Sequence, residues 1–77
     1  MRFEIIMNMP TKKGDLVHRL VVEHRAKSLV DFVNELTEYD FVIVEEFFPD
    51  DTIGAYKSHG LAAINRRFVG KIKQWER

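Results

Sequence analysis

One stretch of the sequence, SLVDFVNELTEYDFVIVEEFFP at residues 28–49, predicts a capped helix that turns directly into a strand. Ser28 is a favourable N-cap, and Asp31 suits both a shortened capping box and the positive end of the helix dipole. Apolar residues then follow at helical spacing and leave mainly acidic and amide side chains outside. These apolar residues are Leu29, Phe32, Val33 and Leu36.

The run after this helix, residues 41–44, is apolar at four successive positions. Such a run is typical of a central strand that is buried on both faces. The helix would cover one face, and a second helix or a partner subunit would have to cover the other. Glu45 and Glu46 continue the strand with one acid on each face. We expect Pro49 to end the strand, because proline cannot donate a ladder hydrogen bond.

The N-terminal part of the chain predicts a β-hairpin. Large apolar residues fall mainly on odd positions between residues 3 and 9, and alternation returns between residues 16 and 24. The segment between these runs contains Pro10 and Gly14, which suit a turn. In the second strand we expect the even positions to face inward, namely Leu16, His18, Leu20, Val22 and His24.

We expect residues 50–60 to form a polar loop, and residues 61–75 have two interpretations. A helical projection brings the large apolar residues to one side and leaves a basic face, which predicts a basic amphipathic helix. The alternative is two strands joined by a tight turn at Arg66 and Arg67, which Gly70 and the neighbouring β-branched residues favour. We favour the helix, because strand alternation would divide the large apolar residues between two faces.

The predicted fold class is therefore α+β: a β-hairpin, a helix, a central strand and a C-terminal basic amphipathic helix. The alternative is a ββαββ sheet with one helix. The 77 residues support one domain with a modest core. There is no cysteine to provide a disulfide or a thiolate zinc site, so we expect self-association to add stability. The expected assembly is a homo-oligomer.

Charge is segregated along the chain although it sums to zero. Residues 1–30 carry six basic and three acidic residues, residues 31–52 carry eight acids and no Lys or Arg, and residues 53–77 carry six basic residues and one acid. A balanced charge argues against coating of nucleic acid by bulk charge. The predicted contact residues are the acids Glu35, Glu38, Glu45 and Glu46 and the basic residues Arg66, Arg67, Lys71, Lys73 and Arg77.

Familiar catalytic motifs are missing, and we predict that the protein is not an enzyme and binds no cofactor. The sequence has no cysteine, no G-x-S-x-G motif and no P-loop. His18 and His24 lie about 20 Å apart on one strand, whereas ligands of one zinc ion approach it to about 2.1 Å. A mixed metal site of His59 with Asp50 and Asp51 is left open, although ordinary loop positions explain these residues better.

These observations favour a non-enzymatic protein-interaction or regulatory module that self-associates through its acidic and basic surfaces. The alternative is a small nucleic-acid-binding protein, in which Arg66, Arg67, Lys71 and Lys73 contact phosphates and an aromatic residue stacks on a base. The start of the chain lacks the apolar region of a signal peptide, and no apolar run approaches the ~18 residues of a membrane span. We therefore expect a cytoplasmic protein without a membrane partner.

Overall fold

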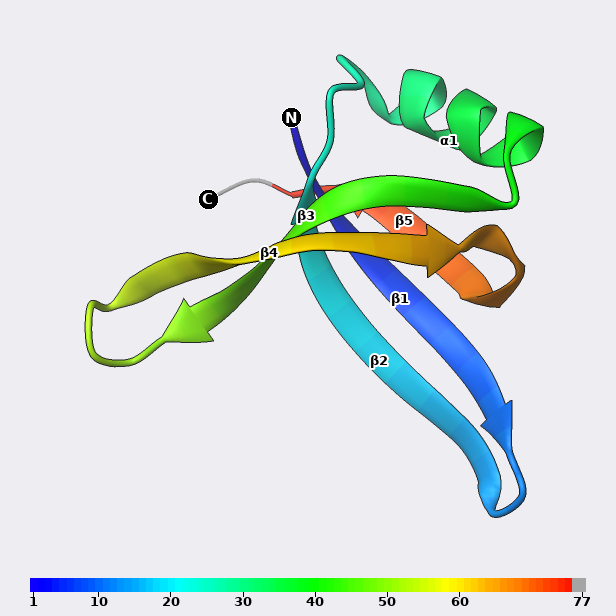
Figure 1. The fold of residues 1–77 in the computed structure, drawn as a ribbon, viewed down its shortest axis with the longest axis horizontal. Helices are drawn as coiled ribbons and strands as arrows, with labels where there is room; N and C mark the ends of the chain where they lie inside the picture. The colour runs from blue at the N-terminus through cyan, green and yellow to red at the C-terminus, as the bar shows by residue number, and fades with distance from the viewer. Residues whose placement is uncertain (76–77) are drawn as a thin grey trace.

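The computed structural model describes residues 1–75, and these residues form a mostly β domain. Five antiparallel strands make one sheet in the order β4-β3-β2-β1-β5, with one α-helix and one short 3-10 turn, η1. The chain meanders through four strands, and β5 then returns to pair with β1 (Figure 1). The elements are β1 (Arg2–Thr11), β2 (Gly14–Glu23), α1 (Leu29–Glu38), β3 (Phe41–Asp50), β4 (Ala55–Asn65), η1 (Arg66–Phe68) and β5 (Val69–Gln74).

β1 and β2 form the predicted hairpin. The last paired residues of the two strands are Thr11 and Gly14, so the turn between them contains two residues. Gly14 has φ 121°, a conformation that is rarely open to other residues. The end of this hairpin projects beyond the rest of the sheet (Figure 1), so only part of the predicted inner face is covered. Of that face, Leu20, Val22 and His24 are buried, whereas Leu16 and His18 are exposed.

α1 covers one face of the sheet and begins as predicted. The Ser28 side chain accepts a hydrogen bond from the Asp31 N–H at 3.1 Å. The ring of Phe32 stacks on Phe3 of β1 with centroids 4.5 Å apart, which joins the helix to the centre of the sheet. The core consists of Phe3, Ile5, Met7, Leu20, Val22, Phe32, Leu36, Val42, Val44 and Ile64.

The apolar run at the start of β3 is buried on one face only. Val42 and Val44 point into the core, while Phe41 and Ile43 are exposed on the other face. This alternation is the ordinary period of a strand, and the predicted burial on both faces is not found. Pro49 does not end the strand, since it lies opposite Tyr56 in the β3–β4 ladder.

The predicted C-terminal helix is wrong, and the fold is mostly β rather than α+β with two helices. The segment forms β4, η1 and β5, so the strand pair considered as the alternative is closer to the structure. The predicted loop is reduced to residues 51–54, because β4 already begins at Ala55. Ile72 lies opposite Ile5 of β1 and packs against the core. Pairing with an open strand edge therefore outweighs the helical periodicity.

The sheet curls so that its two edges approach each other. Tyr56 of β4 and Trp75, which follows β5, belong to opposite ends of the strand order, yet their ring centroids are 5.0 Å apart. The Arg2 guanidinium lies 4.3 Å from the ring centroid of Phe47 and 5.7 Å from that of Trp75. Val21 is buried on the face away from α1. A second, smaller packed layer therefore forms on that face.

Candidate interaction surfaces

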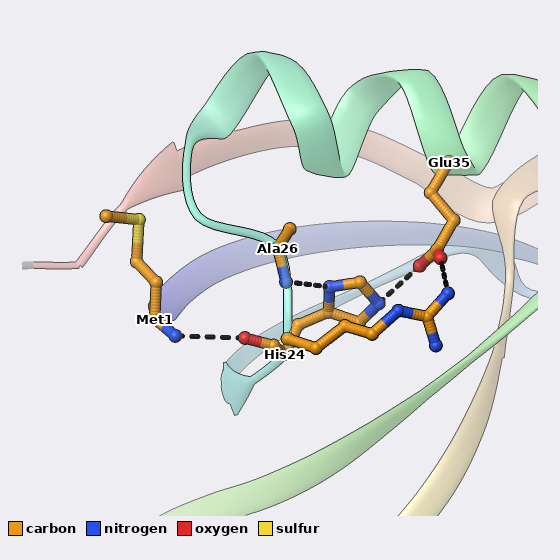
Figure 2. Close-up of polar contacts among 5 residues, drawn as sticks. Met1, His24, Ala26 and Glu35 are labelled. Carbon is orange, nitrogen blue, oxygen red and sulfur yellow. Dashed lines mark hydrogen bonds and ion pairs between the residues drawn. The ribbon is translucent and has the colours of Figure 1, made fainter.

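His24 lies just after β2 and contacts α1, and its two ring nitrogens have different partners (Figure 2). Nδ1 accepts a hydrogen bond from the Ala26 N–H at 3.0 Å, so it carries no proton. Nε2 faces the Glu35 carboxylate and lies in direct contact with one of its oxygens. The other carboxylate oxygen accepts a hydrogen bond from Arg25. Glu35, a predicted contact residue, is thus engaged within the chain.

The position of His24 indicates a structural role. Its side chain is 3% exposed, and its ring lies 4.6 Å from that of Phe32. Its main chain exchanges hydrogen bonds with Met1 at 2.9 and 3.0 Å, and the Met1 ammonium pairs with Glu23 at 2.6 Å. Both ring nitrogens are engaged within the chain, Nδ1 with Ala26 and Nε2 with Glu35. His24 joins β1, β2 and α1.

Arg66 contacts the C-terminal end of α1 from the connection between β4 and β5. The last turn of α1 contains no basic residue, although two glutamates lie near that negative end of the helix dipole. The Arg66 guanidinium donates to the main-chain carbonyls of Leu36 at 3.3 Å and Thr37 at 2.8 Å, and it lies 3.3 Å from Asp40. The role of Arg66 was not predicted, because nothing in the local sequence links it to a helix 30 residues earlier.

Of the other basic candidates that the structure describes, only Lys71 lines the groove between α1 and β5 to which Arg66 also belongs. Lys73 lies 3.9 Å from Glu4, whose hydrogen bond with Arg19 raises the pKa of that guanidinium. Arg67 is exposed on η1. Neither Lys71 nor Arg67 forms an ion pair with an acid among residues 1–75. The fifth candidate, Arg77, lies outside the described residues.

The acidic candidates face different parts of the molecule. Glu45 lies on the face away from α1 and accepts a hydrogen bond from the Ser58 hydroxyl at 2.5 Å. Glu46 lies opposite Val22 and therefore on the face toward α1. Glu38 is exposed at the end of the helix. Together with Glu35, which contacts His24, these residues do not present one continuous acidic patch.

Exposed apolar residues instead gather at the start of β3 and on the facing part of β4: Tyr39, Phe41, Ile43 and Leu61. We call this group the β3–β4 apolar surface. Its members are 55%, 58%, 58% and 77% exposed, in that order. The strand residues share the face away from α1, with Ile43 opposite Ala63 and Leu61 opposite Glu45. The apolar run at residues 41–44 was the sequence signal for this surface.

The main chain at this surface is also open on one side. The Arg66 N–H donates to the Asp40 carbonyl at 3.0 Å, which makes this a hydrogen-bonded pair of the β3–β4 ladder. Because such pairs alternate, the main-chain groups of Phe41 and Ile43 point away from β4. Within the described residues β2 pairs only with residues 45–47 of β3. A small cavity of about 170 Å³ lies beside Phe41 and Ile43 and is also lined by His24 and Glu35.

Two further types of site are not found among residues 1–75. No group of three or more potential metal ligands lies close enough to hold an ion, so His59 is not joined with Asp50 and Asp51 in such a group. His59 instead packs edge-on against Phe48, with ring centroids 4.9 Å apart. None of the helices in this part of the chain has the length and apolar character needed to cross a bilayer.

Four of the large apolar residues that are exposed among residues 1–75 belong to the β3–β4 apolar surface. No family model, no curated protein and no solved structure matches the chain.

Proposed function

We propose that this protein is a non-enzymatic protein-interaction or regulatory module that self-associates through the β3–β4 apolar surface. The supporting observation is the joint exposure of Tyr39, Phe41, Ile43 and Leu61. Single exposed apolar residues are common, but neighbouring ones mark contact sites, and aromatic residues are enriched in the centres of interfaces. A two-fold contact would cover the exposed face of β3 in both copies.

Charges of both signs border the apolar surface. Arg25 and Glu45 line the same small cavity beside Ile43 and Leu61. Arg25 remains largely exposed despite its contact with Glu35. A surface with both signs at its border can be complementary to itself, which a two-fold contact requires. The segregated charges of the sequence would then contribute at the edge of the contact rather than at its centre.

The expected affinity is modest. Burying the exposed part of each large apolar side chain contributes about 1–2 kcal/mol. In a two-fold contact each of these residues is buried in both copies, so its contribution is made twice. Association costs about 4–15 kcal/mol in lost freedom of motion. With four such residues in each copy the gain is about 12 kcal/mol, and an association cost at the low end of this range, about 4–6 kcal/mol, leaves about 6–8 kcal/mol, so we expect a dissociation constant in the micromolar range.

Nucleic-acid binding by Arg66, Arg67, Lys71 and Lys73 has less support. Two of these residues contact acids within the chain, Arg66 through Asp40 and Lys73 through Glu4. The aromatic residues interleaved with these basic residues, Phe68 and Trp75, are also engaged, since Phe68 packs against the core and Trp75 contacts Tyr56. A steeply salt-dependent shift of single-stranded RNA would favour this alternative.

The test is the solution mass as a function of protein concentration, measured by sedimentation. We expect the wild-type mass to rise from monomer toward dimer between about 1 and 500 μM. Ile43→Lys should remain monomeric, because it places a charge in the contact. Val30→Lys is the matched control, since Val30 is also an exposed β-branched residue but lies on α1. A wild-type protein that stays monomeric throughout would overturn the proposal.

A further inference from the structure

An open groove of about 410 Å³ separates α1 from β5. Its walls are mainly apolar, with Leu29, Val33 and Leu36 on the helix and Val69 and Ile72 on the strand. The volume lies in the range of about 300–1,000 Å³ that is typical of ligand pockets. The groove contains none of the four residues of the β3–β4 apolar surface. A function of this groove can therefore be tested independently of self-association.

One wall of the groove is a sheet edge with unpaired main-chain groups. Within the described residues β5 pairs only with β1. The Trp75 N–H donates to the Arg2 carbonyl at 3.0 Å, so these two residues form a hydrogen-bonded pair. Since such pairs alternate along an antiparallel ladder, the N–H and C=O groups of Ile72 and Gln74 point to the open side. An extended peptide could add to this edge as a further strand.

The side chains of β5 determine which peptide would fit. Lys73 lies opposite Glu4 and Lys71 opposite Ile6, on the face away from α1, whereas Ile72 lies opposite Ile5 on the core face. An added strand would therefore place alternate side chains beside the two lysines and the remaining ones over the apolar groove. Acidic side chains suit the first set of positions, and apolar side chains suit the second.

The charge of the groove supports the same choice of ligand. The residues that line it include Arg66 and no acid, and Lys71, whose side chain lies on the other face of β5, is at its edge. Lys71 forms no ion pair with an acid in residues 1–75, and the Glu4 near Lys73 already accepts hydrogen bonds from Arg19. We propose that the groove between α1 and β5 binds an extended segment of a partner protein in which acidic and apolar residues alternate.

The binding test uses a fluorescent hexapeptide of alternating glutamate and valine, blocked at both ends, and measures fluorescence anisotropy. We expect saturable binding, and at least about tenfold weaker binding of the same peptide with lysine in place of glutamate, because the lysine peptide repels Lys71 and Lys73. Absence of saturable binding of the glutamate peptide up to about 1 mM, or equal binding of both peptides, would overturn the proposal.

Methylation of the peptide nitrogens tests the addition of a strand without altering the protein. One peptide carries methyl groups on its valine nitrogens, and its matched control carries them on its glutamate nitrogens. Only alternate peptide N–H groups face the neighbouring strand, so one of the two should lose binding and the other should keep it. Loss through the valine nitrogens indicates antiparallel addition, and loss through the glutamate nitrogens indicates parallel addition. Equal affinities of the two methylated peptides would exclude strand addition.

A pair of protein variants locates the site. Lys71→Glu should weaken binding of the glutamate–valine peptide about threefold to tenfold, since an attraction becomes a repulsion. Lys12→Glu makes the same change of charge in the exposed turn between β1 and β2 and should alter binding less than about twofold. Equal effects of the two variants would show that the peptide responds to net charge only, and would overturn the assignment to this groove.

Discussion

Phe32 and Phe41 are the same residue type on neighbouring elements, and they have opposite environments. Phe32 is fully buried between the rings of Phe3 and His24, whereas Phe41 is largely exposed. We expect Phe32→Ala to lower the free energy of unfolding by about 3–5 kcal/mol, because it leaves a cavity in the core. That is a large part of the roughly 5–15 kcal/mol that holds a domain of this kind together. Urea denaturation at low protein concentration measures the change.

Phe41→Ala is the control for this measurement, and it should change the stability of the monomer by less than about 1 kcal/mol. Similar losses in the two variants would contradict the assignment of Phe32 to the core and Phe41 to the surface. The sequence already predicted the inward position of Phe32, since helical periodicity is a local property. The exposure of Phe41 depends on which element covers that face of β3, and no local pattern contains this information.

Glu35 shows that local sequence patterns also do not reveal the partners of candidate site residues. The sequence placed this residue on the outer side of a helix and predicted that it contacts a basic surface on this or another subunit. In the structure its carboxylate contacts His24 and accepts a hydrogen bond from Arg25, and both of these residues precede the helix. Periodicity describes the faces of one element, but the partner of a side chain depends on how two elements pack.

The connection between α1 and the C-terminal strands rests on Arg66. Its guanidinium donates to two carbonyls at the end of α1 and compensates for the absence of a basic residue there. We expect Arg66→Gln to lower the free energy of unfolding by about 1 kcal/mol, less than for a buried charged hydrogen bond because Arg66 is partly exposed. Hydrogen exchange of the last turn of α1 should accelerate in the variant.

Arg67→Gln is the neighbouring control, and it should change stability by no more than about 0.5 kcal/mol. Arg67 donates its main-chain N–H to Asn65, a contact that the substitution leaves in place. If Arg66→Gln and Arg67→Gln lowered the free energy of unfolding equally, the role assigned to the Arg66 guanidinium would be wrong.

The elements themselves were predictable to different degrees. The N-terminal hairpin and α1 each carry a clear period in the sequence, the start of β3 is marked by an apolar run, and all three were predicted close to their observed positions. The C-terminal segment failed because Ile64, Phe68 and Ile72 fit a helical face, while in the structure Ile64 pairs with Val42 and Ile72 with Ile5. These pairings use strand edges far away in the sequence, which the period of a single segment does not reveal.

At the scale of the whole molecule, the contact between Tyr56 and Trp75 reports whether the sheet is curled. Trp75 is the only tryptophan, and its ring contacts that of Tyr56 across the two ends of the strand order. We expect Tyr56→Ala to shift the tryptophan emission to longer wavelength and to lower stability by about 1 kcal/mol, because the ring loses an aromatic partner and gains contact with water. Fluorescence spectra of the folded proteins test the shift.

The other tyrosine provides the matched control. Tyr39 lies at the end of α1 and belongs to the β3–β4 apolar surface. Tyr39→Ala should leave the emission maximum of the monomer unchanged. A wavelength shift of equal size in both variants would show that the emission does not report the contact between Tyr56 and Trp75.

The return of β5 to β1 has a consequence for biosynthesis. Phe3 pairs with Gln74, so β1 receives its second neighbour only after the residues of β5, far later in the chain, have been made. At about 5–20 residues per second, synthesis of the 77 residues takes about 4–15 s. During this time the nascent chain can form the β1–β2 hairpin, but the other edge of β1 has no partner. The residues of β5 must therefore leave the ribosome before β5 can pair with β1 and complete the sheet.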